Sequence, residues 1–261
     1  MMIGAFRSAW TMLARPVLLW PGLGAIILFS VTSITFTFTT AAAPGGSRLT
    51  DPPLTLALLS APNTLAIMVG RPVMITGVVV LAIAIVQITS QYSSGFVRIA
   101  FVYQPRRALW LVGNWLAVAA AAVIASVIGS LIALATTLVC AAAWSVDTTS
   151  WGDNIGQTIG AIGNLALGMI AFAVAGSALA VWLRSPIAAL ASGLVYALFE
   201  NLLNTAAPFG QGLLPVSAFS TVATSGLGGE PYWPSLIAST VLLTAIAAGT
   251  IGLVTSRDVT E

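Results

Sequence analysis

The carboxylate of Glu200 is the strongest candidate for chemistry, because it stands in the largely apolar stretch FENLLN with two amides close by. Asn201 follows it directly, and Asn204 lies one helical turn further on, on the same face as Glu200. An ionisable group inside a membrane helix is costly, so it is a functional candidate by default. Two interpretations remain open: a polar lining or proton site within the bilayer, or a carboxylate at a helix mouth near water.

Other kinds of catalytic chemistry are excluded by residue types that the sequence lacks. It contains no histidine, and all nine of its basic residues are arginine. A bis-histidine haem, a histidine-ligated zinc centre and a Ser-His hydrolase all require histidine. A Walker-type GxxxxGK[ST] loop requires lysine. The single cysteine, Cys140, cannot form an internal disulfide. We therefore expect no catalytic residues, no metal site and no cofactor bound by this chain.

The composition predicts the kind of fold that positions these residues. Of the 261 residues, 58% are hydrophobic and only 6% are charged, whereas a soluble domain carries about 25% charged residues. Apolar stretches long enough to cross a ~30 Å hydrocarbon core, about 20 residues each, recur along the chain. We therefore expect an all-α polytopic membrane protein, with residues 1–261 forming one transmembrane domain. The six expected membrane helices cover about 16–40, 72–89, 108–143, 156–183, 186–205 and 234–255.

Residues 1–15 are expected to form a separate amphipathic helix at the membrane interface. Its apolar positions share one helical face, and its arginines lie off that face: Ile3, Phe6, Trp10 and Leu13 against Arg7 and Arg15. A frayed terminus is the alternative. Residues 16–40 could instead be a signal peptide, since Ala41-Ala42-Ala43 resembles a cleavage site. The apolar run exceeds the ~7–15 residues of a signal h-region, so we predict a retained anchor.

The distribution of arginine predicts the orientation, because short cytoplasmic loops are enriched in basic residues. With the N-terminus placed inside, most arginines fall on the cytoplasmic side: Arg7, Arg15, Arg98, Arg106, Arg107, Arg184 and Arg257. Only Arg48 and Arg71 fall outside. The acidic residues show the reverse bias. Both termini are therefore expected in the cytoplasm, and residues 41–71 and 206–233 are expected to form outer caps or partly inserted turns.

Glycines on the fourth expected helix allow close helix approach. They are Gly156, Gly160, Gly163, Gly168 and Gly176. Both internal packing and a subunit interface would explain them.

The segment between the second and third helices is basic but also strongly apolar. Arg98, Arg106 and Arg107 satisfy the bias toward positive cytoplasmic loops, which does not explain the apolar residues between them. These are Phe96, Val97, Ile99, Phe101, Val102 and Tyr103. A short helix that docks on a partner would carry such residues, whereas a hydrated loop would not. Gly95 can begin this segment and Pro105 can end it.

The same region resembles the type 2 ABC transporter permeases. The resemblance lies in Gln91-Tyr92-Ser93-Ser94-Gly95, an apolar run, and Pro105-Arg106-Arg107-Ala108-Leu109. Further points of similarity are six helices, an N-terminal interfacial helix, an outer Leu213-Leu214-Pro215 and the ending Arg257-Asp258. Two positions depart from the family pattern. Gln91 stands where the family usually has glutamate, and Asn114 stands where a lysine often begins the third helix.

The resemblance implies a function as the permease subunit of an ATP-driven exporter in the bacterial cytoplasmic membrane. Residues 96–105 would be a cytoplasmic coupling helix seated on a separate ATPase, which would bind ATP and magnesium. A second permease copy or a paralogue would complete the dimer, with membrane lipid around it and no nucleic acid. The apolar helices favour a lipophilic or amphipathic cargo such as a drug, peptide or lipid. The alternatives are an ion-coupled carrier or channel that uses Glu200, and a non-transporting membrane scaffold.

Overall fold

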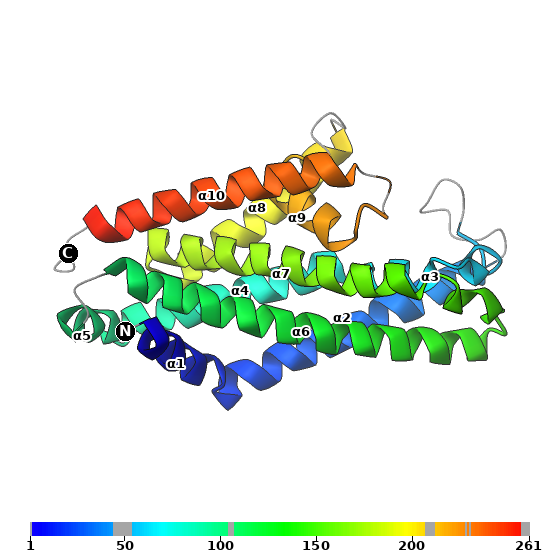
Figure 1. Cartoon of the computed structure of the whole chain (residues 1–261), viewed down its shortest axis with the longest axis horizontal. Coiled ribbons are helices and arrows are strands. Elements are labelled where there is room, and N and C mark those ends of the chain that lie inside the picture. Colours follow the sequence, from blue (N-terminus) through cyan, green and yellow to red (C-terminus); the bar gives the residue numbers. More distant parts are fainter. Residues whose placement is uncertain are drawn as a thin grey trace.

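The computed structural model describes residues 2–43, 54–103, 107–206, 212–227, 229 and 231–256 of the chain. This part is helical throughout and contains no strand (Figure 1). Six segments are long and apolar enough to cross a membrane. They are α2 (Pro16–Ala41), α3 with α4 (Thr64–Gly70 and Val73–Ser93), α6 (Arg107–Ala143), α7 (Ile155–Leu183), α8 (Pro186–Ala206) and α10 (Tyr232–Ser256). The expected all-α, multi-pass membrane fold is therefore confirmed.

The predicted second helix proves longer than the sequence suggested. The chain has a helical turn, α3, before Pro72, and α4 begins directly after it. Proline has no N–H to donate, so it separates the two helices. α3 is nonetheless buried in the bundle, with Met68 and Val69 fully covered. Its seven residues are far fewer than the about 20 that mark a spanning helix in a sequence.

The N-terminal helix α1 (Met2–Leu13) exists as a separate element and packs against α6. A glycine makes this contact possible: a Cβ on Gly113 would lie 2.5 Å from the Cβ of Ala5. Ala9 and Leu13 are buried in the same contact, whereas Arg7 is exposed. The amphipathic pattern of the first residues therefore places one face of α1 on the bundle and leaves its arginine outside.

Both long connecting segments contain short helices. In the first, η1 (Leu58–Ser60) meets η2 (Thr149–Gly152), and the Trp151 indole N–H donates to the Leu59 carbonyl at 3.1 Å. Near η2, the backbone N–H of Thr149 donates to Asp147 Oδ1 at 3.0 Å and lowers the pKa of that carboxyl. The first connecting segment is therefore tied to η2 through the hydrogen bond of Trp151.

The second connecting segment contains α9 (Pro215–Ala223), which enters the bundle. Phe219 is fully buried, and its ring meets Phe172 of α7 edge-on at a centroid distance of 5.5 Å. A Cβ on Gly168 would lie 2.4 Å from the Cβ of Ala223, so glycine is needed where α9 crosses α7. α9 is therefore a partly inserted helix packed into the core.

The glycines of α7 divide into two groups. Gly168 and Gly176 pack internally, Gly176 so closely that a Cβ would lie 2.5 Å from the Leu81 carbonyl oxygen. Nothing lies within 4 Å of the Cβ positions of Gly156, Gly160 and Gly163. Internal packing accounts for the first group alone.

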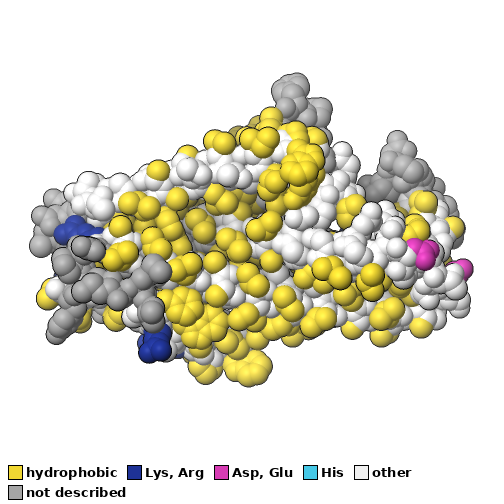
Figure 2. All heavy atoms as spheres, viewed as in Figure 1, with side chains coloured by type: hydrophobic (Ala, Val, Ile, Leu, Met, Phe, Trp, Pro, Cys, Tyr) yellow, Lys and Arg dark blue, Asp and Glu magenta, His cyan; other side chains and the backbone are white. Residues whose placement is uncertain are grey.

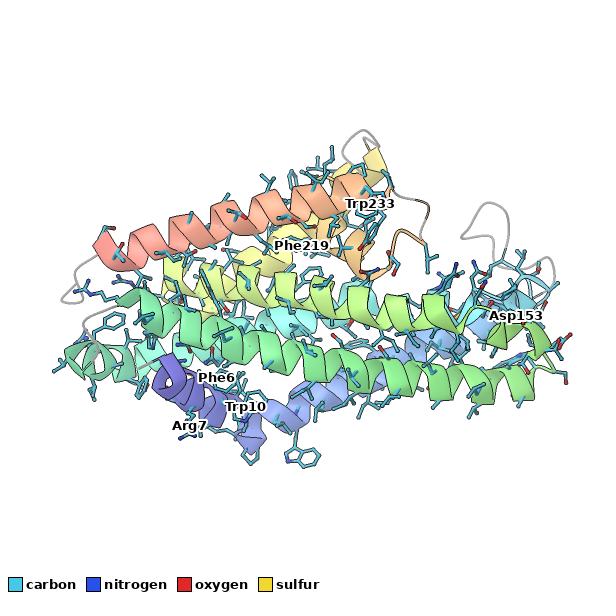
Figure 3. All side chains as sticks on the ribbon, in the orientation of Figure 1. Phe6, Arg7, Trp10, Asp153, Phe219 and Trp233 are labelled. Carbon is cyan, nitrogen blue, oxygen red and sulfur yellow. The ribbon has the colours of Figure 1, made fainter. Side chains whose placement is uncertain are left out.

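Most charged side chains lie toward one of the two ends of the molecule, although Arg71, between α3 and α4, lies away from the other described arginines. On the face shown in Figure 2, basic side chains gather where α1, α5 and the last turn of α10 lie, and acidic ones gather at the opposite end. Arg7 and Asp153 mark the two ends in Figure 3. We call the first the basic end and the second the acidic end.

Candidate functional site

A short helix, α5 (Phe96–Tyr103), occupies the predicted docking segment at the basic end. It follows α4 after a sharp turn in which Gly95 adopts φ +70°. Glycine adopts this left-handed conformation at the lowest cost, because it has no Cβ. The first turn of α5 then starts at once, with Arg98 N–H donating to the Gly95 carbonyl at 3.1 Å. Gly95 therefore sets the direction in which α5 leaves the bundle.

One face of α5 is anchored to the bundle by aromatic side chains. Val97 is only 2% exposed, and the Phe101 ring meets the buried Trp110 of α6 edge-on at 5.4 Å. Tyr92 meets the same indole edge-on at 6.1 Å. The Arg107 guanidinium lies 5.5 Å from the centre of the Phe101 ring, in cation–π range. Val97 and Phe101 therefore hold α5 against the bundle.

The opposite face of α5 is free and carries apolar side chains beside a cation. Ile99 is 59% exposed and Val102 is 80% exposed. Arg98 is exposed next to them. Ile99 and Val102 form what we call the outer face of α5, whereas Arg98 lines a cavity together with Val97 and Phe101. Among the described residues of the predicted docking set, Ile99 and Val102 are exposed apolar side chains that a partner could contact.

Directly behind α5, three buried amides connect α4 to α6. The Oδ1 of Asn114 accepts hydrogen bonds from Gln91 Nε2 at 2.6 Å and from Gln87 Nε2 at 2.9 Å. The amide nitrogen of Asn114 donates to the Trp110 carbonyl at 2.9 Å. All three side chains are at most 1% exposed. This cluster ties the base of α5 to the first turns of α6, which also carry Trp110.

Glu200 lies elsewhere, and its carboxylate caps α9. It is 1% exposed, and its two oxygens accept the backbone N–H groups of Val216, at 2.9 Å, and of Ser217. These are unpaired donors of the first helical turn, which a capping side chain normally satisfies. Leu214, at the N-cap position, has no such side chain. A carboxylate also suits the positive end of the helix dipole.

The polar residues near Glu200 differ in their burial. Asn201 is exposed, and Asn204 Oδ1 is buried without a hydrogen-bond partner among the described residues. Tyr196, one turn before Glu200, lies within hydrogen-bonding reach of the carboxylate. The carboxylate itself faces the N-terminus of α9, and the polar lining expected from Glu200, Asn201 and Asn204 stays a prediction.

Several predicted residues lie outside the described residues. They are Pro105, Arg106, Arg257, Asp258 and the side chain of Tyr103. Sequence reasoning missed Gln87, although Gln87 and Gln91 recur at i and i+4 in an otherwise apolar helix, which is a signal for a shared polar face. It also missed Arg184, which ends α7 beside α5. In the described part of the chain, no group of three or more acidic, cysteine or histidine side chains converges as a metal site would require.

No family model matches the chain, and no curated protein is significantly similar to it.

Proposed function

We propose that this chain is the permease subunit of an ATP-driven ABC exporter, which moves a lipophilic or amphipathic substrate such as a drug, peptide or lipid. The observation that carries the proposal is the outer face of α5. The inner side of α5 is anchored to the bundle through Val97 and Phe101. A movement of α5 would therefore also move α4 and α6. The exposed Ile99 and Val102 of α5 offer the apolar contacts that a groove on an ATPase would bury.

The two departures from the family pattern support the proposal because they contact each other. Gln91 and Asn114 share a hydrogen bond of 2.6 Å. At positions where the family usually has an acid and a base, an ion pair could join the same two helices. Here a neutral pair of amides makes the connection. The amide pair would serve the same purpose as such an ion pair, which is to fix the base of the coupling helix.

The charge distribution supports a location in the bacterial cytoplasmic membrane with both termini in the cytoplasm. Arg7, Arg98, Arg107 and Arg184 belong to the basic end, as the positive-inside rule requires of cytoplasmic loops. α5 lies at that end, where a cytosolic ATPase could reach it. The ATPase subunits would bind ATP and magnesium and perform hydrolysis. This chain would be non-catalytic and would pair with a second permease, identical or paralogous.

The test is capture of the tagged chain from its native membranes in mild detergent, followed by an ATPase assay. We expect a stoichiometric ATPase subunit in the wild-type complex. Ile99→Asp and Val102→Asp should each reduce this ATPase at least tenfold, since each places a charge in an apolar contact without touching the bundle. Leu58→Asp is the matched control, because Leu58 is 47% exposed at the acidic end.

The proposal fails if no ATPase is captured, even after crosslinking from positions 99 and 102. The alternatives would then be a channel or carrier that uses Glu200, or a membrane scaffold. Phe101→Asp is a poorer test, because the Phe101 ring packs on Trp110 and a charge there would displace α5 from the bundle.

A further inference from the structure

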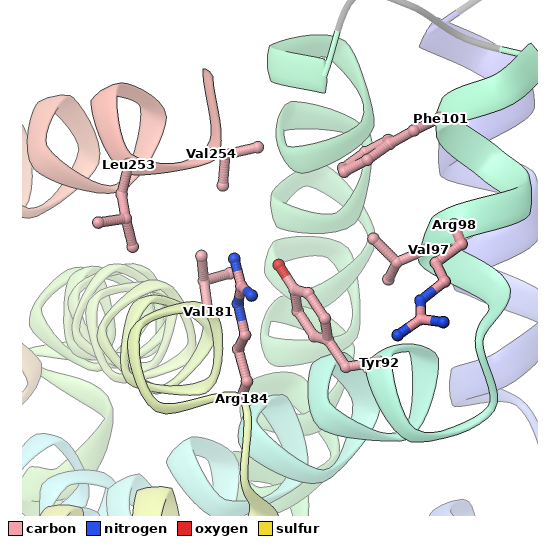
Figure 4. A pocket seen from close by; sticks show the side chains of 8 residues that line it. All are labelled: Tyr92, Val97, Arg98, Phe101, Val181, Arg184, Leu253 and Val254. Atoms are coloured by element: carbon pink, nitrogen blue, oxygen red, sulfur yellow. The ribbon is translucent and has the colours of Figure 1, made fainter. Parts of the chain in front are cut away.

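A cavity of about 80 Å³ opens at the basic end, where four helices meet (Figure 4). A water molecule needs about 10–15 Å³ of such space, so the cavity has room for a group of several heavy atoms. α4 and α5 supply one side of it and α7 and α10 the other. Its lining consists of Tyr92, Val97, Arg98, Phe101, Val181, Arg184, Leu253 and Val254.

Two guanidinium groups from different elements reach this cavity. Arg98 comes from α5 and Arg184 from the end of α7, and Figure 4 shows both beside the ring of Tyr92. The Arg184 guanidinium lies 5.9 Å from the centre of that ring. The described lining contains no carboxylate. Two cations that line one small cavity with apolar walls raise the local positive potential, which favours an anionic ligand there.

The left-handed backbone conformation of Arg184 indicates that its side chain has a role in binding. Arg184 ends α7 in the left-handed conformation, with φ 50° and its N–H donating to the Ala180 carbonyl at 2.9 Å. Glycine or asparagine usually occupies this position, because other side chains are strained there. An arginine in this conformation directs its guanidinium toward Tyr92. Strained residues of this kind concentrate at binding sites.

The other half of the cavity is apolar and firmly held. Val181 of α7 and Val254 of α10 are buried, and Leu253 lies beside Val254. The Trp182 indole donates to Thr250 Oγ1 at 3.1 Å, which keeps α7 and α10 together next to the cavity. A ligand that fits must therefore offer an anion to the arginines and an apolar portion to α10.

We propose that this cavity binds a phosphate group, and that an anionic phospholipid is its source. Arginine forms strong charge-assisted hydrogen bonds with phosphate oxygens, and basic pockets between membrane helices bind lipid headgroups. The cavity lies at the ends of the candidate spanning helices α4, α7 and α10, where the polar headgroup region of a bilayer begins. The phosphate would bridge Arg98 and Arg184, and the glycerol and upper acyl chain would contact Leu253 and Val254. The lipid would thus link α5 to α7 and α10.

Binding can be measured on the purified full chain by native mass spectrometry and thermal unfolding in detergent. The probes are phosphatidylglycerol, phosphatidylcholine and inorganic phosphate. We expect phosphatidylglycerol to bind at least tenfold more tightly than phosphatidylcholine. Each arginine near the membrane surface contributes about 1 kcal/mol toward an anionic lipid, so Arg98→Gln and Arg184→Asn should each weaken binding roughly fivefold. Asparagine tolerates the left-handed conformation, which keeps the Arg184 variant folded.

The matched control is Arg7→Gln, because Arg7 is an exposed arginine of the basic end that does not line the cavity. Its binding should equal that of the wild type. Tight binding of inorganic phosphate, lost in the same two variants, would support the phosphate site but assign it to a soluble ligand. Equal binding of both lipids by wild type and variants would overturn the proposal. So would variants that lose the captured ATPase but bind phosphatidylglycerol normally, since the arginines would then serve a protein partner.

The proposal is independent of the exporter function, because lipid binding by the isolated chain requires no ATPase. A failed capture of the ATPase would leave the lipid measurement interpretable, and the reverse is also true. The fallback, should Arg184→Asn prove unstable, is Arg98→Gln alone, which alters an exposed side chain.

Discussion

Among single residues, Asn114 has the most demanding environment, because one oxygen serves two buried donors. Gln87 and Gln91 both donate to its Oδ1. Gln87 Oε1 has no partner among the described residues, so one acceptor of the cluster is already unpaired. Any replacement of Asn114 by an apolar residue would leave two buried amide groups unpaired, which is costly.

An exchange of charges tests whether Gln91 and Asn114 stand in place of an ion pair. Gln91→Glu or Asn114→Lys alone would bury an unpaired charge, and we expect either to lower the free energy of unfolding by about 3 kcal/mol or more. The double variant should recover most of this loss, because the new charges lie in contact. Thermal unfolding in detergent measures all three variants.

The control for this cycle is Ser93→Glu, which adds the same charge at an exposed position of α4 and should be nearly neutral. Additive losses in the double variant would show that the two side chains do not act as a pair.

Glu200 is the second residue whose role the contacts define. Glu200→Gln removes one of the two acceptors that cap α9 and turns an amide N–H₂ toward a backbone donor. We expect a loss of about 1–2 kcal/mol in the free energy of unfolding, the usual cost of a lost cap. Transport activity, once reconstituted, should persist with an unchanged pH profile. Loss of transport together with its pH dependence, at unchanged stability, would instead establish a proton-coupled role for Glu200.

Among the elements, the long helices were predictable and the short ones were not. A run of some 20 apolar residues is sufficient to indicate a spanning helix, and α2, α6, α7, α8 and α10 begin and end within about two residues of expectation, a normal boundary error. α3 and α9 were not predictable as buried helices, since seven and nine residues carry no such signal. Their burial depends on neighbours that are distant in sequence.

At the candidate site, too, the sequence could not predict contacts between residues that are distant along the chain. The apolar and basic pattern of residues 96–103 predicted α5, but not which face would be covered. That face is decided by Trp110, whose contact with Phe101 depends on how α6 is rotated against α4. The hydrogen bond between Gln91 and Asn114 joins residues 23 positions apart. No local pattern in the sequence could place them together.

The packing of α9 on α7 predicts that alanine substitutions at two glycines of α7 change the free energy of unfolding in opposite directions. Gly160→Ala should be neutral or stabilising by about 0.5–1 kcal/mol, because its surroundings are open and alanine is the better helix former. Gly168→Ala should be destabilising, since its Cβ would overlap Ala223. Thermal unfolding of both variants measures the difference. Equal effects would mean that α9 does not pack on α7 in the membrane.

For the whole molecule, the separation of charge between the two ends predicts its orientation. Cys140 is the only cysteine and is buried, so replacing it with serine gives a background for labelling. Val102→Cys then reports on the basic end and Leu58→Cys on the acidic end, as both side chains are exposed. Neither position lies within a spanning helix.

In intact cells, a membrane-impermeant maleimide should label Leu58→Cys but not Val102→Cys. After the membranes are opened, both should react to a similar extent, which shows that each cysteine is accessible. This result is expected because basic residues are retained on the cytoplasmic side during insertion. Labelling of Val102→Cys in intact cells would place α5 outside. No cytosolic ATPase could then reach its outer face, and the exporter proposal would fail together with the orientation.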